Sequence, residues 1–140
     1  MILHHFTNIA AAQNIAAEGF IRPHAWTFAK GAPAVAWFTA DDERATVYTG
    51  WHDEPVAVVA RAYRFTVDVP DADVTHWRDW LALAGRGKPL ADCDPEVAAY
   101  KARWFVTTRP VPRAEWIDSA IVVDGDALLD ALEEVTRRPA

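Results

Sequence analysis

Cysteine and serine are almost absent from this sequence of 140 residues, which contains only Cys93 and Ser119 of these two types. A single cysteine excludes an internal disulfide and a cysteine-rich metal site. No stretch approaches the roughly 18 apolar residues that a membrane-spanning helix needs. The N-terminus lacks the successive basic, apolar and cleavage regions of a signal peptide. These absences predict a cytoplasmic protein, and a hydrophobic content of 51% predicts a folded one.

Several motifs that identify common catalytic sites are absent as well. The chain has no GxGxxG or GxxxxGK[ST] phosphate-binding loop, no HExxH zinc motif and no GxSxG nucleophile elbow. The adjacent residues His4 and His5 fall on a predicted strand, so their side chains point to opposite faces and cannot bind one metal ion. We therefore expect one of them to face the core or a cleft and the other to face outward, and we predict no metal site.

Charge and aromatic content give weaker indications of the partner. A formal net charge of −6 argues against tight binding to a nucleic-acid backbone, which depends on lysine and arginine. A local basic patch is still compatible with this charge, and the arginines that could form it are Arg61, Arg64, Arg103 and Arg109. The seven tryptophans suit core packing best. The alternative is a stacking surface for a base or a nicotinamide.

Hydrophobic periodicity and end signals predict a mixed set of strands and helices. Gly19 is expected to end a first helix that Thr7 or Asn8 begins. Because strands and helices do not alternate regularly, the pattern predicts one α+β domain over residues 1–140 instead of a doubly wound parallel sheet. The predicted strands cover residues 2–6, 34–38, 56–69 (one strand, or two with a bend near 60–62), 104–108 and 117–123, and the predicted helices begin near residues 8, 41, 73 to 75, 94 and 126.

Four segments occur together and in order along the chain. They are His4-His5-Phe6-Thr7, Ala36-Trp37-Phe38-Thr39, Arg64-Phe65-Thr66-Val67, and the run from Arg109 to Trp116 that reads RPVPRAEW. With them the chain resembles the ADP-ribosyltransferase superfamily, in the branch that contains the DNA-modifying toxin DarT and the RNA 2′-phosphotransferases. It is most similar to small uncharacterised bacterial proteins with "YHFT", "WFT" and "RPIPxxEW" segments. The resemblance implies a split mixed or antiparallel sheet with flanking helices, and a transferase of toxin or phage type that uses NAD.

The same resemblance implies roles for individual residues. His5 would hydrogen-bond the adenosine ribose of NAD, and Thr7 or its backbone would hold the nicotinamide side. Trp37 or Phe38 would stack near the nicotinamide, and Thr39 would occupy a small polar position at the end of its strand. Breaking the glycosidic bond builds positive charge on the ribose, so such a site also needs a nearby carboxylate.

The chain departs from the family at that carboxylate. Trp104 stands where a catalytic glutamate would open the late strand. The nearest acid, Glu115, is either a displaced equivalent or a surface residue beside Trp116. In the 2′-phosphotransferase scheme, basic and histidine residues act on phosphates instead, and Arg64, Arg103 and Arg109 would serve there.

Three functions are therefore open at this stage. The first is an NAD-dependent ADP-ribosyltransferase-like protein that modifies a nucleic acid, a protein or a small molecule. The second is a catalytically inactive member of the same fold that binds a nucleotide or a partner. The third is a protein-interaction domain that docks through a tryptophan-rich surface formed by Trp26, Trp51 and Trp77.

Overall fold

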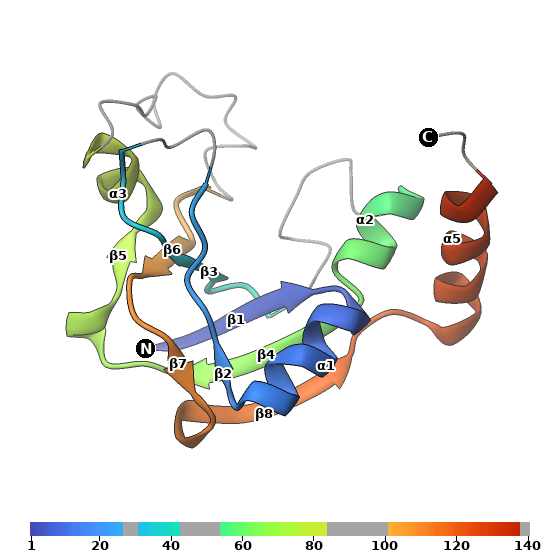
Figure 1. Cartoon of the computed structure of the whole chain (residues 1–140), viewed down its shortest axis with the longest axis horizontal. Coiled ribbons are helices and arrows are strands. Elements are labelled where there is room, and N and C mark those ends of the chain that lie inside the picture. The colour runs from blue at the N-terminus through green and yellow to red at the C-terminus, as the bar shows by residue number, and fades with distance from the viewer. Residues whose placement is uncertain (27–30, 43–53, 84–100, 138–140) are drawn as a thin grey trace.

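The computed structural model describes residues 1–26, 31–42, 54–83 and 101–137 (Figure 1). Within these residues the chain forms four α-helices, one six-stranded antiparallel sheet and one two-stranded sheet, which confirms the predicted α+β class. The elements are β1 (Ile2–Thr7), α1 (Ile9–Glu18), β2 (Phe20–Ile21), β3 (Ala36–Thr39), α2 (Pro55–Ala60), β4 (Tyr63–Asp68), β5 (Thr75–His76), α3 (Trp77–Leu83), β6 (Trp104–Thr107), β7 (Val111–Pro112), β8 (Trp116–Ile121) and α5 (Gly125–Arg137), with 3₁₀ turns at Asp71–Asp73 and Arg113–Glu115.

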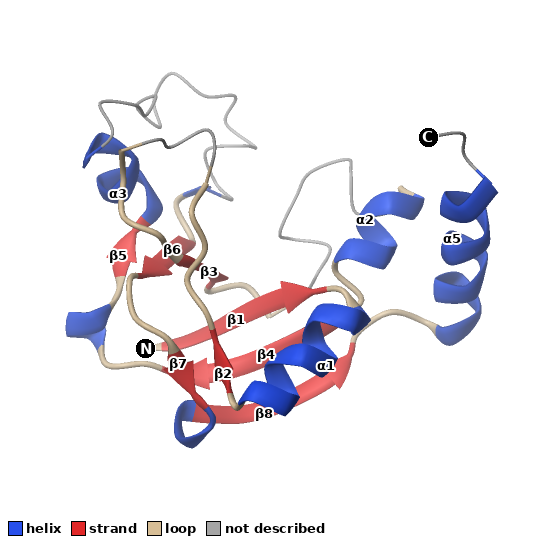
Figure 2. Ribbon diagram, in the orientation of Figure 1, coloured by secondary structure: helices blue, strands red, loops and turns tan. Residues whose placement is uncertain are grey.

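The large sheet consists of two halves that meet at one residue pair. Its strand order is β5-β6-β3-β1-β4-β8. The pairing of β1 with β4 is continuous from Ile2 to Thr7, whereas β1 and β3 pair only at His4 and Thr39. Figure 2 shows β3 and β6 turned away from the direction of β1 and β4. The two central strands therefore separate beyond this pair.

The alternation of side chains along β3 divides the buried residues into two cores on opposite faces of the sheet. Ala36 and Phe38 belong to a core that α1, β2 and β7 cover, and its other members are Leu3, Ala12, Ile21, Phe65, Val67, Val69 and Val111. Trp37 points to the other face, where α3 packs on the sheet. That second core contains Val35, Trp77, Trp80, Leu81, Trp104 and Val106.

The ends of α1 follow the predicted signals. The side chain of Asn8 accepts a hydrogen bond from the backbone N–H of Ala11 at 2.7 Å, which satisfies one of the free donors of the first turn. Gly19 ends the helix in the left-handed conformation, with φ at 86°, and its N–H donates to the carbonyl of Ile15.

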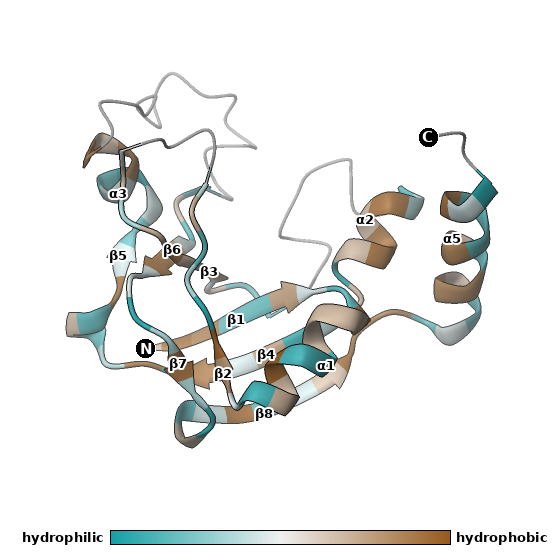
Figure 3. Cartoon of the chain, viewed as in Figure 1, coloured by the Kyte–Doolittle hydropathy of each residue, from teal (hydrophilic) through white to brown (hydrophobic). Residues whose placement is uncertain are grey.

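The predicted strand over residues 56–69 is wrong in its first half. Residues Pro55–Ala60 form α2, and the strand β4 begins only at Tyr63. Pro55 stands at the first helical position, where its missing N–H costs nothing, and α2 packs against α5. Hydrophobic residues lie along both helices (Figure 3), so tertiary burial outweighs the strand preference of the valines.

The other predicted elements have mixed outcomes. The strands near 2, 34, 104 and 117 and the helix near 126 are confirmed within a few residues. The helix expected from residue 73 or 75 begins at Trp77, because Thr75–His76 pair with β6. The helices expected near 41 and 94 fall largely outside the described residues. No helix in the described part of the chain has the length and apolar character needed to cross a membrane.

Candidate functional site

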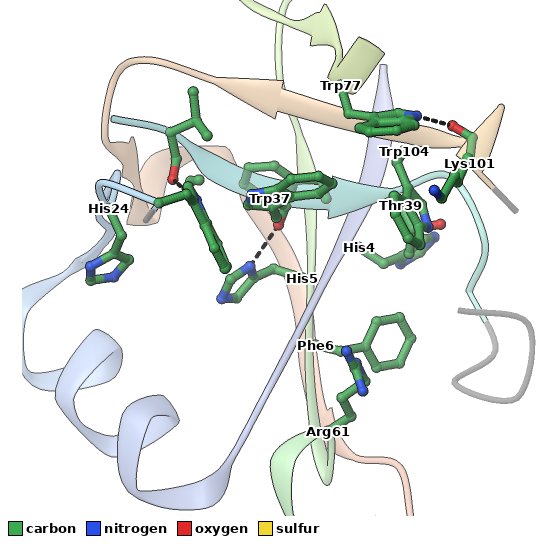
Figure 4. A pocket seen from close by; sticks show the side chains of 14 residues that line it. His4, His5, Phe6, His24, Trp37, Thr39, Arg61, Trp77, Lys101 and Trp104 are labelled. Atoms are coloured by element: carbon green, nitrogen blue, oxygen red, sulfur yellow. Dashed lines mark hydrogen bonds between the residues drawn. The ribbon is translucent and has the colours of Figure 1, made fainter. Parts of the chain in front are cut away.

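A pocket of about 490 Å³ opens where β1 and β3 separate. This volume lies within the range of small-molecule and cofactor sites. Its walls combine aromatic, imidazole and cationic side chains from six parts of the chain (Figure 4). The lining residues are His4, His5, Phe6, His24, Trp26, Val35, Ala36, Trp37, Phe38, Thr39, Arg61, Trp77, Lys101 and Trp104.

His5 occupies the gap between the two separating strands. Its Nδ1 atom lies 2.8 Å from the carbonyl oxygen of Trp37, and a carbonyl can only accept, so Nδ1–H is the donor. Burial lowers the pKa of His5 below its ordinary value of 6.5, which outweighs the opposing effect of the hydrogen bond. The ring is therefore neutral at pH 7, and its Nε2 atom carries a lone pair. In Figure 4 this second nitrogen points away from Trp37.

His4 lines the same pocket from the opposite face of β1. Its Nδ1 atom lies 3.0 Å from the hydroxyl of Thr66, and the residue is buried, with 8% of its surface exposed. Burial, and then the positive charge of Arg64, lower its pKa. The expectation that one of the two histidines faces outward is wrong, because His4 is buried and both His4 and His5 line the pocket.

The tryptophans of the pocket form one packed cluster around Trp37. Its ring centroid lies between 5.5 and 6.2 Å from those of Trp26, Trp77, Trp80 and Trp104, mostly in edge-to-face geometry. The indole N–H of Trp37 is buried and has no hydrogen-bond acceptor among the described residues. Core packing, the favoured expectation for the tryptophans, holds for Trp77, Trp80 and Trp104, whereas Trp26 is exposed. The rings of Trp26, Trp37, Trp77 and Trp104 form an aromatic wall of the pocket.

Two cationic side chains complete the pocket. Arg61 follows α2, and the Lys101 ammonium lies 5.0 Å from the centre of the Trp77 ring. No aspartate or glutamate of the described chain lines the pocket. The protein has a net charge of −6, but Arg61 and Lys101 make this pocket locally positive, which favours an anionic ligand.

The structure brings together five of the nine predicted site residues. His5, Trp37, Phe38, Thr39 and Trp104 all line the pocket. The ring centroids of Phe38 and His5 lie 5.6 Å apart. Thr39 pairs with His4 on β1 and with Trp104 on β6. Their common position is the junction of the two sheet halves.

The other four predicted residues do not line the pocket. Thr7 pairs with Tyr63 at the far end of β1. Arg64 projects from β4 and donates through Nη1 to the carbonyl oxygen of Asp42 at 2.7 Å. Its charge reaches the site only through its effect on His4.

Arg109 and Glu115 bind each other outside the pocket. Nη1 and Nη2 of Arg109 donate to the two carboxylate oxygens of Glu115 at 2.7 and 2.8 Å. Asp73 also accepts from Nε and Nη2. The hydrogen bonds from Glu115 and then Asp73 raise the pKa of Arg109 above its ordinary value. This cluster joins the turn after β7 to the 3₁₀ turn before β5, which is a structural arrangement.

Sequence reasoning missed His4, Phe6, His24, Arg61, Trp77 and Lys101 as lining residues. Each belongs to an element whose neighbours in space are distant in the sequence. For Lys101 the connecting contact is the Trp77 indole N–H, which donates to the Lys101 carbonyl oxygen at 2.6 Å. No local pattern in the sequence predicts this contact.

Comparison with known protein families, curated proteins and solved structures finds no match to this chain. A metal centre has no support from the described part of the chain, which contains no group of three histidine, cysteine or acidic side chains that could hold an ion.

Proposed function

We propose that this chain is an ADP-ribosyltransferase-like protein that binds NAD or a related nucleotide in the pocket between β1 and β3. The observation that carries the proposal is the neutral His5 ring, which the Trp37 carbonyl holds with Nε2 as an acceptor that no described residue engages. A ribose hydroxyl is a donor that suits such an acceptor. The resemblance in sequence also implies that His5 hydrogen-bonds the adenosine ribose of NAD.

The other walls of the pocket support a nucleotide over a purely apolar ligand. The faces and edges of Trp26 and Trp37 offer stacking surfaces for a base or a nicotinamide. Lys101 and Arg61 suit the phosphates.

The split sheet supports the assignment to this superfamily. The resemblance requires a cleft that joins His5, Thr39 and the strand of Trp104, and the pocket joins these three residues. If a carboxylate also reaches the ribose, the activity that follows is transfer of ADP-ribose from NAD to an acceptor, in which the nicotinamide–ribose bond breaks and nicotinamide leaves.

A second candidate function is NAD binding without turnover. It is favoured by the lack of a carboxylate among the described lining residues, and by the engagement of both Glu115 oxygens with Arg109. The docking hypothesis has less support, because Trp77 is buried with 4% of its surface exposed and Trp51 lies outside the described residues.

The test is calorimetric titration of NAD, together with a measurement of nicotinamide release, on the wild type, His5→Ala and His5→Asn. Asparagine can still donate to the Trp37 carbonyl but cannot place an acceptor where Nε2 lies. We expect NAD to bind the wild type and to bind both variants about tenfold more weakly, since a polar contact inside the pocket is lost.

Thermal unfolding of each variant checks that the fold is retained. Release of nicotinamide by the wild type would support the transferase, and binding without release would support the inactive form. Absence of NAD binding by the folded wild type would refute the proposed function.

A further inference from the structure

We infer that the pocket contains an anion subsite in which Lys101 and Arg61 bind a phosphate or pyrophosphate group. The inference deepens the proposed function and rests on it for the identity of the complete ligand. It makes its own claim, however, that these two cations recognise the charged part of the ligand.

Lys101 carries most of this argument. Its backbone is fixed by the Trp77 indole N–H, and its side chain extends so that the ammonium lies over the Trp77 ring. The residue is partly buried, and no carboxylate of the described chain forms an ion pair with it. A partly buried ammonium that faces an aromatic wall is stabilised by the ring quadrupole, yet its three N–H donors still need acceptors.

Arg61 supplies a second cation from a different element. It is the C-terminal cap of α2, where its backbone N–H donates to the carbonyl of Ala57 at 3.1 Å. In Figure 4 its side chain lies beside Phe6, and His4 lies between it and Lys101. His24 and His5 lie on the left of the same view.

In this view the two cations lie to the right of His5 and His24 in the pocket. Asp41 and Asp42, whose charges act on His4, do not line the pocket. Asp41 is already bound by Arg103. A guanidinium and an ammonium together match the oxygens of a phosphate group, which a neutral nucleoside lacks.

The experiment compares ligands that differ in charge. Calorimetric titrations of ADP, adenosine and inorganic pyrophosphate would use the wild type, Lys101→Gln, Arg61→Gln and the control Arg137→Gln. Arg137 is an exposed cation on α5 that pairs with Glu133 and does not line the pocket. Each protein would be tested at two salt concentrations and checked for folding by circular dichroism.

We expect ADP to bind the wild type at least about tenfold more tightly than adenosine, and pyrophosphate to bind and compete with ADP. Lys101→Gln should remove most of the difference, Arg61→Gln should reduce it, and Arg137→Gln should leave it unchanged. Higher salt should weaken ADP and leave adenosine nearly unaffected.

Equal binding of ADP and adenosine, binding of neither, or a loss that Arg137→Gln reproduces would overturn the anion subsite. Its failure can be told apart from failure of the proposed function. Pyrophosphate and ADP that bind through Lys101 while NAD does not bind would retain the subsite and refute the NAD site. If NAD binds through His5 and Lys101→Gln has no effect, the NAD site is retained and the anion subsite is refuted.

Discussion

The Nδ1 atom of His5 lies 2.8 Å from the carbonyl oxygen of Trp37, at the point where β1 and β3 stop pairing. A backbone carbonyl on a separating strand loses the N–H partner that a continued ladder would give it. The imidazole replaces that partner, so one contact stabilises the opening of the sheet and also fixes the tautomer of the ring. The geometry of the pocket and its chemistry thus depend on the same residue.

The two buried histidines of the pocket predict how the free energy of unfolding depends on pH. Burial lowers the pKa of His5 in the folded protein, and burial together with Arg64 lowers that of His4. Well above pH 6.5 both rings are neutral in the folded and unfolded states. Below it the unfolded chain binds protons that the folded chain does not, so the free energy of unfolding falls with pH until the lowered pKa values are reached. Each histidine contributes a slope of at most about 1.4 kcal/mol per pH unit.

Urea unfolding between pH 8 and pH 5 measures this slope. His5→Asn removes one titrating ring and should make the curve shallower, whereas the carboxylates contribute equally to both proteins and cancel in the difference. Parallel curves for the wild type and His5→Asn would contradict the lowered pKa of His5.

Glu115→Gln separates a structural role from a catalytic one. The substitution keeps the size of the side chain but removes the charge that holds Arg109 in a two-point ion pair. Because both residues are partly exposed, we expect the free energy of unfolding to fall by only about 1 kcal/mol. NAD affinity should be unchanged, since neither residue lines the pocket.

Chemical unfolding and the NAD titration check the two parts of this expectation. Asp73→Asn, which weakens the same cluster from its other side, is the matched control. If Glu115→Gln retained stability and abolished nicotinamide release, the catalytic role predicted from the sequence would be supported instead.

The local signals of the sequence were enough for the ends of α1 and for most strands, but not for α2. Pro55 at the start and the run Val56 to Ala60 fit a helix beginning and a buried strand equally well. What decides between them is the packing of α2 on α5, which is a contact between distant segments. The same limit applies to the pocket: His5 and Trp37 carried a recognisable pattern, whereas Lys101 is placed by Trp77.

Trp80 is expected to be the costliest tryptophan to truncate in the second core. Only 1% of its surface is exposed, and its indole N–H donates to the carbonyl of Pro33 at 2.8 Å. Trp80→Ala should lower the free energy of unfolding by about 4 kcal/mol, because it leaves a cavity and an unpaired carbonyl. Trp80→Phe should cost about 2 kcal/mol, since it keeps much of the packing but not the hydrogen bond.

Chemical unfolding of both variants tests this order. Leu83→Ala on the same helix is the control, because that side chain is 67% exposed and its loss should change stability by no more than about 0.5 kcal/mol. Equal losses in Trp80→Ala and Leu83→Ala would show that α3 does not pack as described.

Two glycines allow backbone conformation to be tested apart from packing. A Cβ atom added at Gly19 or at Gly125 would meet no atom within 4 Å, so neither substitution creates a clash. Gly19 has a φ of 86°, which L-residues with a Cβ adopt at a cost, whereas Gly125 does not lie in that region. Gly19→Ala should therefore lower the free energy of unfolding by about 1 to 2 kcal/mol. Gly125→Ala should be neutral or stabilising by up to about 1 kcal/mol, because it restricts the unfolded chain.

Gly19→Asn should fall between the two, since asparagine tolerates the left-handed region better than alanine. Urea denaturation of the three variants measures the difference, and a Gly19→Ala protein as stable as Gly125→Ala would mean that α1 does not end in the left-handed cap.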